Sequence, residues 1–179
     1  MKIAILILPL LVTSCGEFNS ENKPKTEPTY VWADSKPRSN LMYAEIDPFI
    51  DVDKLSTDGI KKLLREMYQI DQKYRDSIIN GNKALQAHFK MKMGANDQAN
   101  KILLDKILDK HGWPVISKFG ADASNISWYV VWHQRDSERA LSKYLGFMEV
   151  ADSIDEMDHE QFELVKNQLA GLRSVGFSD

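Results

Sequence analysis

The chain has 179 residues, the usual size of one domain, and its formal net charge is -3. A mildly acidic chain does not provide the basic surface that nucleic acids require, so we expect no nucleic-acid partner. The sequence contains a single cysteine, which excludes a disulfide within the chain.

The first residues have the pattern of a signal peptide, predicted to span 1–14. Lys2 supplies a positive charge, and the apolar stretch 3–12 is far shorter than the ~20 residues that span a bilayer. The tetrapeptide Val-Thr-Ser-Cys, which ends at Cys15, resembles the bacterial lipoprotein box. This resemblance implies cleavage before Cys15, acylation of that residue (a palmitate-type anchor) and, because Gly16 rather than Asp follows, anchoring in the outer membrane. The alternative is an ordinary secretory signal with a stray cysteine.

Residues 15–45 are predicted to form a lipidated, flexible tether, and residues 46–179 a helical domain. The stretch 16–40 holds three of the six prolines and many Glu, Lys, Ser and Asn residues. Such a composition buries too little apolar surface to order the chain. The tripeptide Tyr-Val-Trp at 30–32 is the exception, as a strand docked on the domain or as a local cluster.

An acidic stretch after the tether suggests a calcium loop, but its spacing does not fit one. Leu55 stands where the EF-hand pattern needs a ligand between Asp51, Asp53 and Asp58. The four histidines lack the spacing of zinc ligands. We therefore expect a solvated acidic loop, with no metal and no cofactor.

Apolar residues recur at helical spacing over the rest of the chain, and no convincing strand alternation is present. The predicted helices span 57–79, 83–93, 96–110, 121–134, 137–151 and 157–172. Gly112 followed by Trp113 and Pro114 is a typical helix stop. The predicted fold is an all-α, compact bundle of five or six helices.

The helix predicted over 121–134 is expected to be the most buried element. Its run at 127–132 reads Ser-Trp-Tyr-Val-Val-Trp, which is apolar almost all the way round a helix. Burial of an aromatic side chain removes roughly 150–250 Å² of surface from water. The aromatic residues expected to be buried in this region are Trp113, Trp128, Tyr129 and Trp132.

Four polar side chains are predicted to point inward, and they come from three helices. Asp71 lies in the middle of an apolar stripe, seven residues after Leu64, and Arg75 follows it at the four-residue spacing of helix neighbours. Asn100 and His133 fall on the buried faces of their own helices. A buried carboxylate must be paired and hydrogen-bonded, so these groups are expected to meet.

Two interpretations of this inward set stay open. In the functional one, Arg75 anchors an anion, His133 acts as acid or base, Asp71 orients it and Asn100 donates a hydrogen bond. In the structural one, the same network fixes the register of the helices. The structural interpretation is favoured, because ion-pair networks also perturb ionisable groups.

Residues from about 63 to 172 resemble a bacterial domain family of unknown function. The positions that match its D-Q-x-x-R, Asn, G-W-P, F-G and helix-ending His pattern are Asp71, Gln72, Arg75, Asn100, Gly112, Trp113, Pro114, Phe119, Gly120, Trp132 and His133. The family continues with an acidic pair after the His, a Gln on the next helix and a Q-x-Y-G-[ST]-Q tail. Here those positions read Gln134, Arg135 and Leu141, with only Gln168 and Gly171 to match the tail. The resemblance supports the inward set and implies no activity.

The expected function is that of a lipid-anchored envelope protein whose helical domain binds a small anionic ligand, a glycan or an envelope protein. The candidate ligand-binding residues are Arg75, Asn100 and Trp113. The alternative is an envelope hydrolase that uses Asp71 and His133 with Arg75 as the anion anchor. The departures near the tail favour binding, and acylation of the lone cysteine excludes thiol catalysis.

Overall fold

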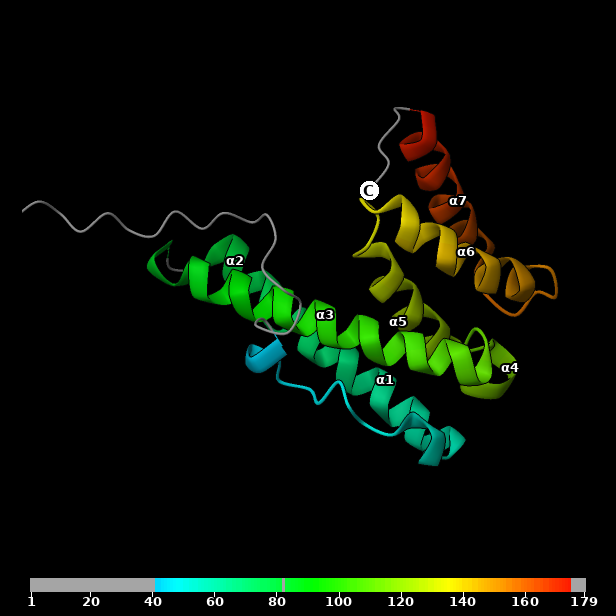
Figure 1. The fold of residues 1–179 in the computed structure, drawn as a ribbon, viewed down its shortest axis with the longest axis horizontal. Helices are drawn as coiled ribbons and strands as arrows, with labels where there is room; N and C mark the ends of the chain where they lie inside the picture. The colour runs from blue at the N-terminus through cyan, green and yellow to red at the C-terminus, as the bar shows by residue number, and fades with distance from the viewer. Residues whose placement is uncertain (1–40, 82, 175–179) are drawn as a thin grey trace, which may run out of the picture. The chain divides into compact units, whose positions relative to one another are not determined.

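The computed structural model describes residues 41–81 and 83–174, and these residues form helices and no strand (Figure 1). The predicted signal peptide, Cys15 and the tripeptide at 30–32 lie outside the described residues. The α-helices are α1 (Thr57–Gln72), α2 (Arg75–Asn80), α3 (Gln86–His111), α4 (Ile116–Phe119), α5 (Ala121–Trp132), α6 (Glu138–Asp152) and α7 (His159–Ser174). Short 3-10 turns are η1 (Leu41–Tyr43), η2 (Val52–Lys54) and η3 (Lys83–Leu85). The predicted all-α class is confirmed.

Helix α1 begins where the side chain of Ser56 accepts a hydrogen bond from the backbone N–H of Gly59. The single helix predicted over 57–79 is wrong, because α1 ends at Gln72 and α2 starts after a two-residue break. At the break, Lys73 and Tyr74 both contact the carboxylate of Glu45. Helical periodicity could not predict this contact, because Glu45 lies far from the break in the chain.

Helix α3 runs without interruption through the two segments predicted as separate helices. Gly94 lies between those two segments and is exposed within α3, although a glycine in a helix interior costs about 1 kcal/mol relative to alanine. Asn96 lies inside the helix and is buried. Its side-chain oxygen accepts the backbone N–H of Glu45 at 2.9 Å, which ties the start of the domain to α3. Residues 41–45 therefore already belong to the folded unit, earlier than the predicted start at 46.

The predicted stop after α3 is present. Gly112 has a φ of 71°, in the left-handed region that favours glycine, and its N–H bonds to the carbonyl of Leu108. Trp113 follows, is buried, and donates its indole N–H to the hydroxyl of Ser124 in α5 at 2.9 Å. The turn thus fixes where α4 and α5 start relative to α3.

The core joins buried side chains of α1, α3, α5, α6 and α7 into one hydrophobic cluster. Helix α5 packs against α1 and α3, and α6 pairs with α7 (Figure 1). The expectation that α5 is buried on most sides is wrong for Tyr129, which is 38% exposed, and holds only in part for Trp128 and Trp132. Helices α1 and α3 pack on α5, and Trp128 donates its indole N–H to the backbone carbonyl of Gln161 in α7 at 3.1 Å. In the described residues, no helix is long and apolar enough to cross a membrane.

Candidate functional site

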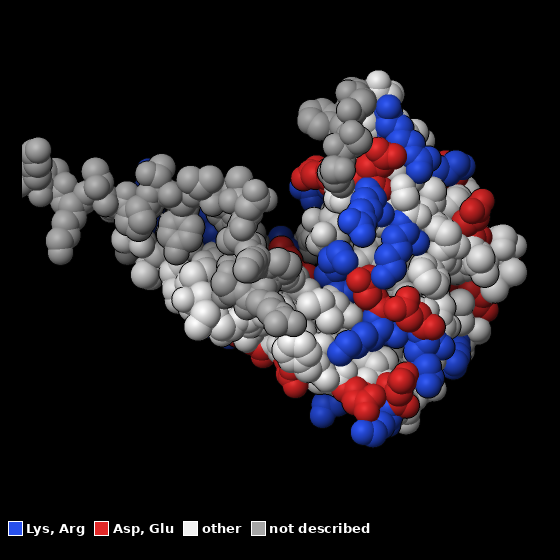
Figure 2. All heavy atoms as spheres, viewed as in Figure 1, with Lys and Arg blue, Asp and Glu red and all other residues white. Residues whose placement is uncertain are grey.

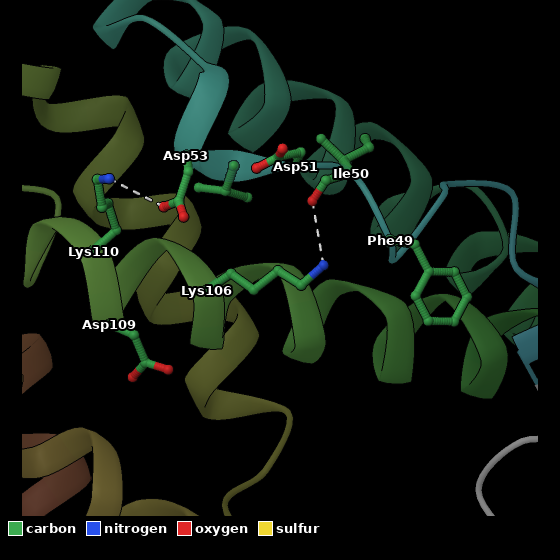
Figure 3. A pocket seen from close by; sticks show the side chains of 8 residues that line it. Phe49, Ile50, Asp51, Asp53, Lys106, Asp109 and Lys110 are labelled. Carbon is green, nitrogen blue, oxygen red and sulfur yellow. Dashed lines mark hydrogen bonds and ion pairs between the residues drawn. The ribbon is translucent and has the colours of Figure 1, made fainter.

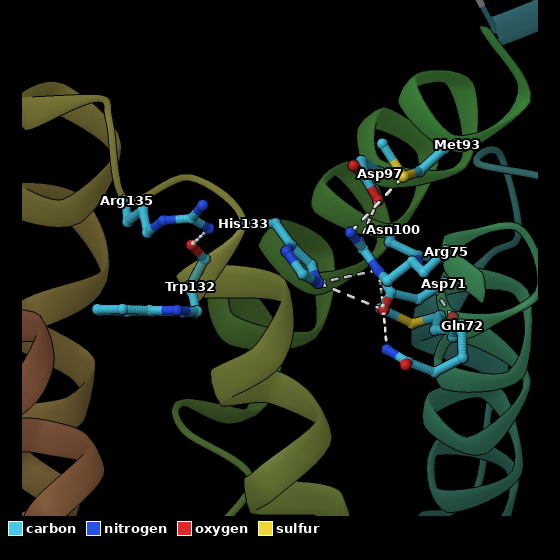
Figure 4. Close-up of polar contacts among 10 residues, drawn as sticks. Asp71, Gln72, Arg75, Met93, Asp97, Asn100, Trp132, His133 and Arg135 are labelled. Atoms are coloured by element: carbon cyan, nitrogen blue, oxygen red, sulfur yellow. Dashed lines mark hydrogen bonds and ion pairs between the residues drawn. The ribbon is translucent and has the colours of Figure 1, made fainter. Parts of the chain in front are cut away.

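Asp71 is the centre of a polar cluster, although its side chain is only 3% exposed (Figure 4). Arg75 donates to both carboxylate oxygens, through Nε at 3.1 Å and Nη2 at 2.6 Å. His133 places Nε2 at 3.1 Å and 3.3 Å from the same two oxygens. The side-chain amide of Gln72 donates to Oδ2 of Asp71 at 2.5 Å. We define the Asp71 cluster as Asp71, Gln72, Arg75, Asp97 and His133. The predicted meeting of Asp71, Arg75 and His133 is therefore what the structure shows.

Helix ends bring these groups together. Asp71 lies in the last turn of α1, Arg75 is the first residue of α2, and His133 caps the C-terminus of α5. Asp71 and Arg75, four residues apart, still contact each other although the helix breaks between them. Because α1 and α5 pack side by side, their C-terminal ends meet at Asp71 and His133.

Burial alone would raise the pKa of Asp71, but the hydrogen bonds from His133 and Arg75 outweigh it and hold that pKa well below its usual range. The carboxylate is therefore ionised and can only accept hydrogen bonds. Nε2 of His133 must carry the hydrogen that it donates to Asp71. This arrangement orients the imidazole and leaves Nδ1 as the nitrogen that faces other partners.

Asp97 joins the cluster from α3, which the sequence interpretation missed. One of its carboxylate oxygens lies 3.1 Å from Nη2 of Arg75, and its side chain is 21% exposed. Burial raises the pKa of Asp97 to about 6; the charge of Asp71 adds to this, while Arg75 and His133 oppose it. Its place three residues before Asn100 on one helix face was the available signal.

A pH dependence of stability follows from Asp97. An acid whose pKa is higher in the folded state than in the unfolded state stabilises the fold fully below pH 3.8, and this contribution is lost as the pH rises through about 6. We expect wild type to lose about 1–3 kcal/mol relative to Asp97→Asn between pH 4 and pH 7. Urea unfolding of both proteins across this range measures the difference. A constant difference across the range would contradict the raised pKa.

Asn100 is buried as predicted, but its amide serves a helix contact. Its Nδ2 donates to the backbone carbonyl of Met67 at 3.0 Å, which links α3 to α1. Its Oδ1 has no hydrogen-bond partner among the described residues. Asn100 thus lies beside Asp97 on α3 without a direct bond to Asp71, and its role as a ligand donor stays a prediction.

Trp113, the third predicted ligand-binding residue, lines a groove between the α3–α4 turn and α6. The groove has a volume of about 480 Å³, within the usual range of small-ligand sites. Its lining is mostly apolar and consists of His111, Gly112, Trp113, Val115, Lys143, Gly146, Phe147, Val150, Ala151 and Ile154. None of these residues belongs to the Asp71 cluster, so the sequence-predicted candidates divide between two places.

A further pocket of about 700 Å³ lies between the 49–53 loop and α3 (Figure 3). Lys106 holds this loop by donating to the backbone carbonyls of Pro48 and Ile50 at 2.8 Å and 3.2 Å. Lys110 pairs with Asp53 at 3.2 Å. Lys106 and Lys110 are thus engaged in holding the loop, and Asp51 and Asp53 face solvent as the predicted acidic loop.

The Asp71 cluster contains two carboxylates and one guanidinium. The guanidinium of Arg75 is shared by two carboxylates, and its Nη1 lies 3.6 Å from the sulfur of Met93. On the face shown in Figure 2, the basic and acidic side chains of the described residues are interspersed. Within residues 41–81 and 83–174, no group of three or more potential ligands is placed to hold a metal ion.

The chemistry available at the cluster is therefore hydrogen bonding and proton exchange by His133 and Asp97.

Comparisons with protein-family models, curated proteins and solved structures gave no match.

Proposed function

We propose that this protein is a lipid-anchored envelope protein whose helical domain binds a ligand at the Asp71 cluster. The main support for binding is that polar side chains of the cluster reach the surface, and that their charges are already paired within the cluster. The side chains of Arg75, Asp97 and His133 are 26%, 21% and 16% exposed, whereas Asp71 beneath them is buried. No member of the cluster is a hydroxyl or thiol nucleophile, so its groups are suited to recognition by hydrogen bonds.

The sequence supports the anchor. The tetrapeptide ending at Cys15 follows an apolar stretch of signal-peptide length, and a polar, proline-containing stretch separates it from the domain. Two or more acyl chains would hold the protein stably at a bilayer, because each buried CH₂ contributes ~0.8 kcal/mol. Because Gly16 rather than Asp follows Cys15, we propose that the anchor lies in the outer membrane.

Mass spectrometry of the full chain, extracted from bacterial membranes, tests both parts. We expect a covalent lipid that is lost in Cys15→Ser, and a non-covalent adduct that is lost in His133→Ala. His159→Ala is the matched control, because His159 is exposed and pairs with Asp152, outside the Asp71 cluster. An unmodified Cys15 would refute the anchor. An adduct that is absent, or equal in both histidine variants, would refute binding at the cluster.

A hydrolase that uses Asp71 and His133 is the second candidate. It is favoured by the oriented imidazole of His133 and by Asp97, whose pKa of about 6 suits proton donation near neutral pH. Engagement of Arg75 by two carboxylates weighs against its use as an anion anchor. An assay with ester and glycoside substrates of the envelope type distinguishes a hydrolase from a binding protein. Hydrolysis by wild type that is lost in both His133→Ala and Asp97→Asn would establish the enzyme.

A further inference from the structure

A row of four aromatic rings runs along α5 and reaches the surface at one end. In order, it runs Trp132, Trp128, Tyr129 and, from α1, Tyr68. The ring centroids of successive members are 5.5 Å, 5.1 Å and 5.5 Å apart. We call these residues the aromatic row.

The row leaves aromatic surface in water, although both of its helices have a separate buried face. Tyr68 and Tyr129 are 37% and 38% exposed, and the two tryptophans are half-buried. Exposed apolar surface that is rimmed by polar groups commonly marks a binding site. Tyr and Trp rings suit such a site, because they combine a large apolar face with a polar atom.

Hydrogen-bonding groups lie one helical turn from each exposed ring. His133 follows Tyr129, and Gln72 follows Tyr68, at the four-residue spacing that puts side chains on one face. On the other side of Tyr129, Asn125 accepts a hydrogen bond from the amide of Gln161 at 3.2 Å. The exposed end of the aromatic row is therefore flanked by amide and imidazole groups, and it adjoins the Asp71 cluster.

The charges beside the row indicate which ligand chemistry fits. Arg75 is held by Asp71 and Asp97, so its guanidinium is not free to bind an anion. A cation competes with Arg135, whose guanidinium already lies 5.8 Å from the centroid of the Trp132 ring. A neutral ligand with flat apolar faces and many hydroxyl groups needs neither the Arg75 guanidinium nor the Trp132 ring, and it suits the exposed tyrosines.

We propose that the aromatic row and the adjoining Gln72 and His133 form an oligosaccharide-binding site. The C–H faces of pyranose rings stack on Tyr68 and Tyr129. The sugar hydroxyls bond to Oε1 of Gln72 and Nδ1 of His133, because Nε2 of each residue is engaged by Asp71. This inference rests on the proposed binding function and names the ligand class of the same site.

The test is a calorimetric titration of the full chain with chitohexaose and with maltohexaose. The protein is kept in a detergent without a sugar headgroup, because a glucoside or maltoside would compete. We expect at least one oligosaccharide to bind, and Tyr129→Ala and Tyr68→Ala to weaken binding about tenfold or more. Tyr129→Phe retains the ring and should bind within about twofold of wild type. Tyr43→Ala, at a similarly exposed tyrosine in η1, should change nothing.

Circular dichroism confirms that each variant is folded before titration. Binding that is insensitive to both tyrosine-to-alanine changes, or equally lost in Tyr43→Ala, would overturn the inference. Absence of binding to both oligosaccharides would also overturn it. In that case a His133-dependent adduct in the mass spectra would leave the proposed binding function standing, and the lack of such an adduct would remove both.

Discussion

Replacing Asp71 with alanine is expected to lower the free energy of unfolding by about 3–5 kcal/mol. Asp71 is the buried countercharge between Arg75 of α2 and His133 of α5, and it accepts hydrogen bonds from both. Its removal leaves Nε of Arg75 and Nε2 of His133 without their acceptor, and Arg75 keeps only its contact to Asp97. Urea unfolding at neutral pH, followed by circular dichroism, measures the change.

The penalty should shrink on acidification. Because the pKa of Asp71 is lowered by folding, its contribution is present above pH 3.8 and is lost as the pH falls below that value. Glu163→Ala, which removes an exposed ion pair to Lys166, is the control and should leave stability essentially unchanged. A loss of less than about 1 kcal/mol in Asp71→Ala at neutral pH would contradict a buried, paired carboxylate.

Trp113→Ala is the second change with a large expected effect, a loss of about 3–5 kcal/mol. The indole is 3% exposed and fills the space between the end of α3 and α5, where it donates to Ser124. Its truncation leaves a cavity in the core and an unused hydroxyl. Urea unfolding with a linear extrapolation gives the free energy, and an unchanged slope shows that the fold is retained.

Two further variants show how much of this loss of stability comes from the hydrogen bond and how much a groove residue at the surface contributes. Ser124→Ala keeps the ring but leaves the indole N–H without a partner, and should cost about 1–3 kcal/mol. Val150→Ala alters an exposed side chain of the same groove and should have little effect on stability. If Trp113→Ala were as mild as Val150→Ala, Trp113 would be a surface residue of the groove rather than a core residue.

Helical periodicity predicted several elements closely. Helix α6 was expected over 137–151 and spans Glu138–Asp152, and α7 was expected over 157–172 and spans His159–Ser174. Both have an apolar stripe that packs on the core, so the local pattern and the tertiary structure agree. The break between α1 and α2, and the continuity of α3, were missed. Both coincide with contacts of Glu45, a residue far from them in the chain.

The aromatic residues of α5 also show that helical periodicity cannot predict contacts between distant helices. Their spacing could not reveal which ring would be covered, because that depends on where α1 and α7 lie. The composition of the run suggested complete burial, and the structure instead leaves the Tyr68 and Tyr129 end of the aromatic row at the surface.

The sequence by itself determined the helical class and placed Asp71, Arg75 and His133 toward the interior, because spacing of three and four residues fixes which side chains share a helix face. It also placed Trp113 at the stop after α3. Only the tertiary structure decided that Asp97 completes the cluster, that Asn100 bonds to the backbone of Met67, and that Trp113 lies in a separate groove. Those outcomes depend on how helices distant in the chain are set against one another, which no local pattern encodes.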